Sequence, residues 1–254
     1  MLALERRNQI YERLLAYKRV VVGELSQEYN VSEETIRRDL DKLEKDGLAI
    51  KSYGGAILNE NTNIDLPFNV RKKHNVSGKQ KIADLVAGLV ESGDHIMLDP
   101  SSTAVFIAKA LKPKERLTVV TNSIEVMLEL SDMNNWNIIA PGGSIRDGIL
   151  ALVGPKATEG IGAYNVEKTI ISCKAFDLKK GFFDSSEDFA HAKQKMLSAA
   201  TERILAVDSS KFGQIAFSKV GDLSDIDVIV TDVKPDEAVL EVLEKAKVRC
   251  IYPE

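Results

Sequence analysis

The chain has 254 residues, of which 44% are hydrophobic, 28% charged and 6% aromatic, and its net charge is −4. This composition excludes a disordered chain and a membrane bundle, and the length predicts one large and one small domain. The first four residues are apolar and precede basic residues, which is the wrong order for a signal peptide. Since no apolar run approaches the ~20 residues of a membrane span, we expect a cytoplasmic protein without a membrane partner.

The charge is distributed unevenly along the chain. Residues 1–58 hold 10 basic and 10 acidic residues, residues 59–81 hold 5 and 2, and residues 82–254 hold 19 and 26. The first segment is therefore neutral, the second carries +3 and the third carries −7. This asymmetry permits DNA binding by the first segment and disfavours it for the last.

Residues 1–58 predict three helices followed by a β-hairpin. Apolar spacing predicts amphipathic helices over residues 4–17 and 21–29. A third helix follows Ser32, a good N-cap, and ends at Gly47. Two short apolar runs around a Gly-Gly pair then predict the hairpin.

Two consecutive short helices, the second with basic residues on its open faces, favour insertion of a helix into the major groove of DNA. The third helix uses Ile36, Leu40 and Leu43 for its buried face, and the hairpin would form a wing beside the DNA. The competing interpretation is a small helical domain whose charged faces are merely solvated. The candidate DNA-binding residues are Ser32, Thr35, Arg37, Arg38, Lys42, Lys51 and Tyr53.

Residues 59–81 show little periodicity and predict a linker with a short helix near its end. From residue 82 onward helical and strand patterns alternate, which predicts right-handed crossovers and a mostly parallel sheet in an α/β domain. The expected helices cover residues 78–91, 103–111, 123–131, 187–201 and 235–246. The expected strands cover residues 95–98, 117–120, 137–140, 168–172, 203–207, 228–231 and 248–252.

Small polar residues follow several of these strands, at the edge where open parallel sheets bind ligands. N–H and hydroxyl groups there can donate to a phosphate, carboxylates can accept from sugar hydroxyls, and lysines can supply positive charge. The plainer interpretation is that these residues are ordinary helix caps, a solvated lysine and a glycine turn. The candidate effector-binding residues are Asp99, Ser101, Ser102, Thr103, Thr121, Asn122, Ser123, Gly142, Gly143, Lys193, Asp208 and Lys211.

The string Val31-Ser32-Glu33-Glu34-Thr35-Ile36-Arg37-Arg38-Asp39-Leu40, with Gly54-Gly55-Ala56 after it, closely resembles the signature of DeoR-type bacterial transcription regulators. Residues 82–254 resemble the sensor domain of the same family, which is itself similar to sugar-phosphate isomerases such as ribose-5-phosphate isomerase. The matching pieces are Asp99 with Thr103, residues 121–123, Gly142-Gly143, Gly154, Lys193 and residues 208–212. The resemblance implies a winged helix-turn-helix domain over residues 1–58, a linker over 59–81 and an effector-sensing domain over 82–254.

Three departures from the family pattern bear on the sites. Lys51 stands where the family usually has Arg, which keeps the charge and loses bidentate geometry. The stretch Pro100-Ser101-Ser102 lacks the usual glycine and one N–H group. Phe189-Ala190 occupies the place of an acidic residue expected one turn before Lys193. The last two differences, which lie in the effector pocket, predict an unusual ligand or weak binding.

We therefore expect a transcriptional repressor that acts as a homo-oligomer on a double-stranded DNA operator and responds to a phosphorylated sugar or related metabolite. The alternative is a sugar-phosphate isomerase with an appended DNA-binding head, in which Asp99 or Asp208 would be the base. The sequence offers no obvious second acid–base group, so we expect no catalytic residues. The two cysteines and three histidines lack metal-site spacing, and we expect no metal and no cofactor.

Overall fold

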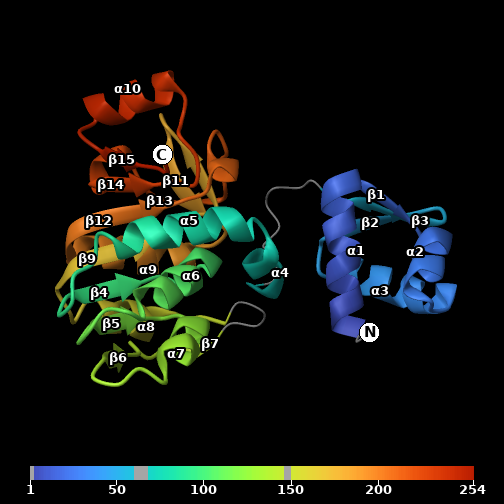
Figure 1. Ribbon diagram of the computed structural model, residues 1–254, viewed down its shortest axis with the longest axis horizontal. Helices are drawn as coiled ribbons and strands as arrows, with labels where there is room; N and C mark the ends of the chain where they lie inside the picture. The colour runs from blue at the N-terminus through green and yellow to red at the C-terminus, as the bar shows by residue number, and fades with distance from the viewer. Residues whose placement is uncertain (1–2, 60–67, 146–149) are drawn as a thin grey trace. The chain divides into compact units, whose positions relative to one another are not determined.

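The computed structural model describes residues 3–59, 68–145 and 150–254. The chain divides into two compact units, residues 1–70 and 71–254 (Figure 1). The predicted linker covers residues 59–81, of which 60–67 lie outside the described residues. Its last part is helical, because α4 (Phe68–Lys73) and the start of α5 (Val76–Ala87) fall within it.

The first unit combines three helices with a three-stranded antiparallel sheet in the order β1-β3-β2. The predicted helices and hairpin are confirmed, whereas β1 was not foreseen because three residues carry no readable periodicity. A Cβ at Gly55 would lie 2.0 Å from the carbonyl oxygen of Val20, so the pairing of β1 with β3 requires glycine there. The elements are α1 (Ala3–Tyr17), β1 (Arg19–Val21), α2 (Val22–Tyr29), α3 (Glu33–Lys45), β2 (Ala49–Ser52) and β3 (Gly55–Leu58).

The second unit is built on a seven-stranded sheet in the order β15-β14-β12-β9-β4-β5-β6, and every neighbouring pair is parallel. The predicted α/β fold with a mostly parallel sheet is thus confirmed. The strands are β4 (His95–Leu98), β5 (Thr118–Thr121), β6 (Asn137–Ile139), β9 (Val166–Ile171), β12 (Ala200–Ala206), β14 (Val228–Val230) and β15 (Arg249–Ile251). The helices after α5 are α6 (Ser102–Leu111), α7 (Ile124–Leu130), α8 (Pro155–Ile161), α9 (Glu187–Ser198) and α10 (Glu237–Lys245).

The order of the strands reverses between β4 and β9. From β4 the chain proceeds outward through β5 to β6, and from β9 it proceeds in the opposite direction through β12 and β14 to β15. Helices α5, α6 and α7 pack in succession on one face, and α9, with α8 beside it, lies on the other (Figure 1). The C-terminal ends of β4 and β9 therefore form a topological switch point, where open α/β sheets bind ligands.

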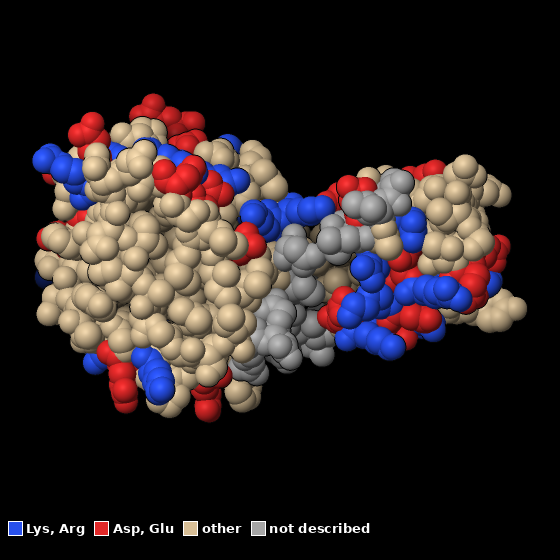
Figure 2. Space-filling model, turned by 90° about the horizontal axis from the view of Figure 1, so that it is seen from below, with Lys and Arg blue, Asp and Glu red and all other residues tan. Residues whose placement is uncertain are grey.

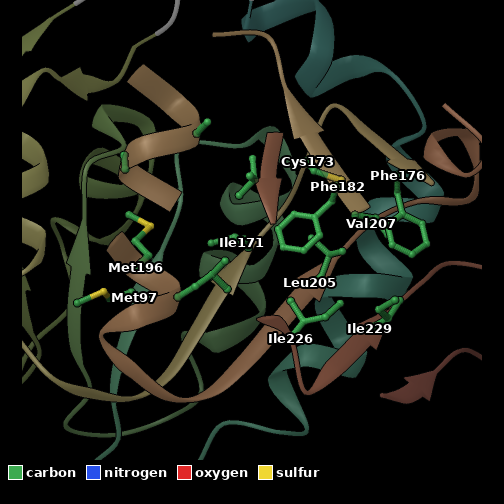
Figure 3. Close-up of a cluster of buried hydrophobic side chains, with 14 of the residues drawn as sticks. Met97, Ile171, Cys173, Phe176, Phe182, Met196, Leu205, Val207, Ile226 and Ile229 are labelled. Carbon is green, nitrogen blue, oxygen red and sulfur yellow. The ribbon is translucent and has the colours of Figure 1, made fainter. Parts of the chain in front are cut away.

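Several short strands were not predicted from the sequence. A small antiparallel sheet contains β10 (Ala175–Asp177), β11 (Gly181–Asp184) and β13 (Ser218–Gly221), and β7 (Ser144–Ile145) pairs with β8 (Leu152–Val153). Phe176 and Phe182 of the small sheet are fully buried in the core that also contains Leu205 and Ile229 of the large sheet (Figure 3).

No helix in the described part of the chain is long and apolar enough to cross a membrane.

Candidate functional site

Helix α3 begins with a side-chain cap. The Oγ of Ser32 accepts a hydrogen bond from the backbone N–H of Thr35 at 3.2 Å, and the backbone of Ser32 is extended, as expected at an N-cap. The Ser32 Oγ and Thr35 Oγ1 lie 2.9 Å apart. The predicted N-cap is thus confirmed, and both hydroxyls stand where α3 starts.

The buried face of α3 is formed by Ile36, Leu40 and Leu43, as the spacing predicted. Asp39 is also buried, and its Oδ2 accepts a hydrogen bond from the Nε of Arg6 in α1 at 2.5 Å. Sequence spacing gave no signal for this ion pair, because its partners are 33 residues apart. Breaking one side of a buried pair is costly, so the pair holds α3 against α1.

Each predicted DNA-binding cation of this unit is exposed and has a carboxylate beside it. On the smaller unit, on the right of Figure 2, basic and acidic side chains are interspersed. The ion pairs are Arg37–Glu33 at 2.6 Å, Arg38–Glu34 at 3.4 Å, Lys42–Asp46 at 2.9 Å and Lys51–Asp41 at 2.5 Å. Tyr53 is fully exposed at the tip of the hairpin, next to Gly54, whose φ of +78° favours glycine.

In the second unit, Asp99 directly follows β4 and connects the two strands of the switch point. Its Oδ2 accepts a hydrogen bond from the N–H of Ser172, the first residue after β9, at 3.0 Å. Its Oδ1 accepts the N–H of Ser101 at 3.2 Å. Asp99 is fully buried, so these bonds replace the water that its carboxylate has lost.

Lys193 of α9 reaches the same point, where the family resemblance grouped it with Asp99. Its Nζ lies 3.0 Å from Asp99 Oδ2, 2.5 Å from Asp184 Oδ2 and 2.7 Å from the carbonyl oxygen of Ser172. Burial alone would lower the pKa of Lys193, but the carboxylates of Asp184 and Asp99 outweigh it and raise the pKa above its usual value. We call Asp99, Ser172, Asp184 and Lys193 the switch-point cluster.

The arrangement of this cluster refines the expected role of Lys193. A lysine ammonium has three N–H donors, and each has an acceptor in the protein. A phosphate can therefore bond Lys193 only by displacing one of them. The sequence missed Asp184, which ends β11: the carboxylate expected one turn earlier in α9 is replaced by two carboxylates from strand ends.

Helix α6 starts immediately beside Asp99. The Oγ of Ser101 caps it by accepting the N–H of Ala104 at 3.0 Å, and Ser102 and Thr103 form its buried first turn. The first N–H groups of a helix have no acceptor within the helix and carry partial positive charge. The start of α6 therefore offers donors for an anion at the switch point.

The loop after β5 adds a buried acceptor. Thr121 and Ser123 serve the backbone: Thr121 Oγ1 donates to the carbonyl of Leu98 at 2.7 Å, and Ser123 caps α7. Asn122 is fully buried and donates from Nδ2 to the carbonyl of Leu152 at 3.0 Å, whereas its Oδ1 has no hydrogen-bond partner among the described residues. Buried polar atoms normally have a partner, so Asn122 Oδ1 is a candidate acceptor for a ligand hydroxyl.

Asp208 and Lys211 belong to a separate group of charges with Lys79 of α5. Burial raises the pKa of Asp208, but the ammonium groups of Lys211 and Lys79 and bonds from Ser210 outweigh it, so the pKa is lowered overall. Lys79 is itself buried and donates to the carbonyl oxygens of Arg71, at 2.7 Å, and of His74. Burial lowers the pKa of Lys79 to about 8.

Gly142 and Gly143 form a turn after β6, with φ values of +82° and +112°. A Cβ at Gly143 would lie 2.8 Å from the Cβ of Ala157 and from the carbonyl oxygen of Val153. These contacts explain the glycine by close packing on α8 and β8, which agrees with the plainer interpretation of this pair as a turn. Among the described residues, no group of three or more His, Cys, Asp or Glu side chains is placed to hold a metal ion.

Both units match families of known proteins. Residues 6–62 match the DeoR-like helix-turn-helix domain, and residues 74–233 match the DeoR C terminal sensor domain. Among solved structures, ribose 5-phosphate isomerase A from Methanocaldococcus jannaschii superposes on 53% of this chain and 53% of its own, with a TM-score of 0.40 and 16% identity.

Full-length relatives carry the names of transcriptional regulators. The uncharacterized HTH-type transcriptional regulator YulB of Bacillus subtilis (strain 168) is 41% identical over 98% of this chain and 96% of its own. The putative aga operon transcriptional repressor of Escherichia coli O157:H7 is 32% identical, over 97% of this chain and 93% of its own. The glycerol-3-phosphate regulon repressor of Escherichia coli (strain K12) is 28% identical, with 94% of each chain covered. The chain therefore belongs to the DeoR family of transcriptional regulators, with a helix-turn-helix DNA-binding unit and a C-terminal sensor domain.

Proposed function

We propose that this chain represses genes of sugar or related carbon metabolism and is released from its operator by a phosphorylated sugar or a similar metabolite. The observation that carries the proposal is the start of α6, whose N–H donors lie beside the buried Asp99 at the switch point of the sheet. The names of the aga operon repressor and the glycerol-3-phosphate regulon repressor, both related over nearly the whole chain, support this class of effector.

In this proposal α3 lies in the major groove. Ser32 and Thr35, at its start, contact phosphate or base edges, and Arg37 and Arg38 supply bidentate contacts to guanine or charge to phosphate. Lys42 and the wing residues Lys51 and Tyr53 contact the adjacent backbone. A homo-oligomer would present paired copies of α3 to the two halves of a palindromic operator.

The effector is proposed to bind along the carboxyl edge of the sheet. Its phosphate accepts from the first N–H groups of α6, at Ser102 and Thr103, and from the hydroxyl of Thr103. Its own hydroxyls bond to Asn122 and Asp99. Lys193 holds the carboxylates of Asp99 and Asp184 in position rather than holding the phosphate itself. Asp208 and Lys211, with Lys79, form a second charged group next along the same edge.

Effector binding can change DNA binding only if the ligand prefers one arrangement of the oligomer over the other. The test first selects an operator duplex from genomic fragments with the full-length protein. That duplex is then titrated with triose, pentose and hexose phosphates and with the corresponding sugars that lack phosphate. Release by one phosphorylated sugar and not by its dephosphorylated form is expected. Release by unphosphorylated sugars alone would refute the assignment of a phosphate site to α6.

We also propose that the sensor domain binds its ligand without converting it. The isomerase alternative needs a base that can leave its bonds, and the buried Asp99 carboxylate already accepts from Ser101, Ser172 and Lys193. Incubation with pentose and hexose phosphates should give saturable binding with no product by chromatography. Turnover above the rate of an Asp99→Asn variant would favour the enzyme.

A further inference from the structure

Two carboxylates stand in the first turn of α3, on the part of the helix that the proposed function places against DNA. Glu33 bonds the guanidinium of Arg37 at 2.6 Å, and Glu34 lies 3.4 Å from that of Arg38. All four side chains are more than half exposed, at 52%, 55%, 63% and 78%. Each arginine proposed to contact DNA therefore has a negative charge one helical turn before it.

The two glutamates contribute only a small amount to the stability of α3, so helix stability alone does not explain their positions. An acid in the first turn of a helix contributes about 0.3–1 kcal/mol through the helix dipole, and an exposed i,i+4 pair about 0.3–0.5 kcal/mol. Ser32 already caps α3 by accepting the N–H of Thr35. Two carboxylates at this place repel a polyanion whether or not the arginines are paired, so they carry a cost for DNA binding.

The two carboxylates weaken contacts to phosphates and contacts to base edges to different extents. A carboxylate beside a guanidinium cancels the attraction of the guanidinium for phosphate. Because phosphates are present at every DNA sequence, this loss is the same at every sequence. A base edge instead offers matched groups: guanine O6 and N7 accept from a guanidinium, and the N4 amino group of cytosine donates to a carboxylate. Repulsion that only the correct sequence relieves is a means of specificity.

We propose that Glu33 and Glu34 are specificity-determining residues of the DNA-binding unit. They weaken contacts of Arg37 and Arg38 to phosphate on arbitrary sequences, and at the operator they accept from cytosine while the arginines donate to neighbouring bases. This inference rests on the proposed placement of α3 in the major groove.

The test compares the full-length Glu33→Gln/Glu34→Gln variant with a control of equal charge, Glu12→Gln/Glu24→Gln. Glu12 in α1 and Glu24 in α2 are exposed and lie outside α3. Binding is measured by fluorescence anisotropy on a duplex of random sequence and on a duplex that the wild-type protein selects from a random library. Salt is varied between about 50 and 200 mM, because the slope of log K against log salt counts the neutralised phosphates.

We expect the α3 variant to bind the random duplex about tenfold more tightly, with a slope steeper by about 2, since each added phosphate contact contributes ~0.9. Its preference for the selected duplex should fall at least about tenfold, which corresponds to a loss of one good base contact. The control variant should change neither the preference nor the slope by as much. If the two variants have the same preference and the same salt slope, the proposal is overturned, and the two carboxylates serve only to stabilise the helix.

An Arg37→Ala/Arg38→Ala variant separates this outcome from a failure of the proposed function. If that variant loses binding to the selected duplex, α3 is the reading helix and the comparison of the glutamate variants decides the inference. If it binds as the wild type does, α3 is not in the groove, and the placement and the inference fall together.

Discussion

Removal of the Lys193 ammonium should destabilise the second unit strongly. In a Lys193→Met variant, Asp99 and Asp184, with side-chain exposures of 1% and 11%, lose the cation that they share, and the carbonyl of Ser172 loses its donor. Breaking a buried ion pair from one side costs about 3–5 kcal/mol. Asp99 keeps the N–H groups of Ser101 and Ser172, so we expect the lower end of this range, about 3 kcal/mol.

Urea unfolding followed by the fluorescence of Trp136 measures this change, because the chain's single tryptophan lies in the second unit. With a slope of about 2–3 kcal/mol per molar urea, the midpoint should fall by about 1 M or slightly more. Lys195→Met, on the exposed face of the same helix, is the matched control and should stay within about 0.5 kcal/mol of the wild type. Adding Asp184→Asn to Lys193→Met should restore part of the loss. A Lys193→Met variant as stable as the control would refute the charge balance described for the switch-point cluster.

Three further outcomes follow from the same contacts. Replacing both Arg37 and Arg38 by Ala should weaken binding to a selected operator by about 1–3 kcal/mol, with only a small change in the melting temperature of the first unit, and unchanged affinity would remove α3 from the reading role. Residues 71–254 alone should bind a phosphorylated sugar in calorimetry and no DNA, since they lack α3; salt-sensitive DNA binding would contradict this. For Lys79, the pKa is about 8 in the fold against 10.5 in the free side chain, so between these values the unfolded chain holds a proton that the folded chain has lost. Stability should therefore rise with pH in this range relative to Lys79→Met, and a difference independent of pH would show that Lys79 is not the group that titrates.

Much of the fold was predictable from the sequence because its long elements are strongly patterned. Helices such as α1 and α3 have clear apolar stripes, and β4 was predicted with the bounds that the structure has. The strands β7 and β8 have two residues each, and β10 has three, which is too short for any periodicity to appear. Their place is set by tertiary pairing.

The candidate site was predictable only where one residue's position decides its role. Ser101 and Ser123 precede helices and cap them, as their residue type suggests. The sequence grouped Lys193 with Asp99 but not with Asp184, because Asp184 ends a strand that only the crossovers bring to this point. The grouping of Asp208 with Lys79 likewise depends on how α5 packs over the sheet, which no local pattern encodes.

In the proposed function, the start of α6 holds the effector that controls DNA binding. The most direct test of this placement is titration of the operator complex of a Thr103→Val variant with the phosphorylated sugar that releases the wild-type protein. Thr118→Val, at the opposite end of the neighbouring strand β5, is the matched control. We predict that both variants bind the operator as tightly as the wild type, and that only Thr103→Val fails to be released at the concentration that releases the wild type. Release of Thr103→Val at that same concentration would show that the effector does not bind at the start of α6.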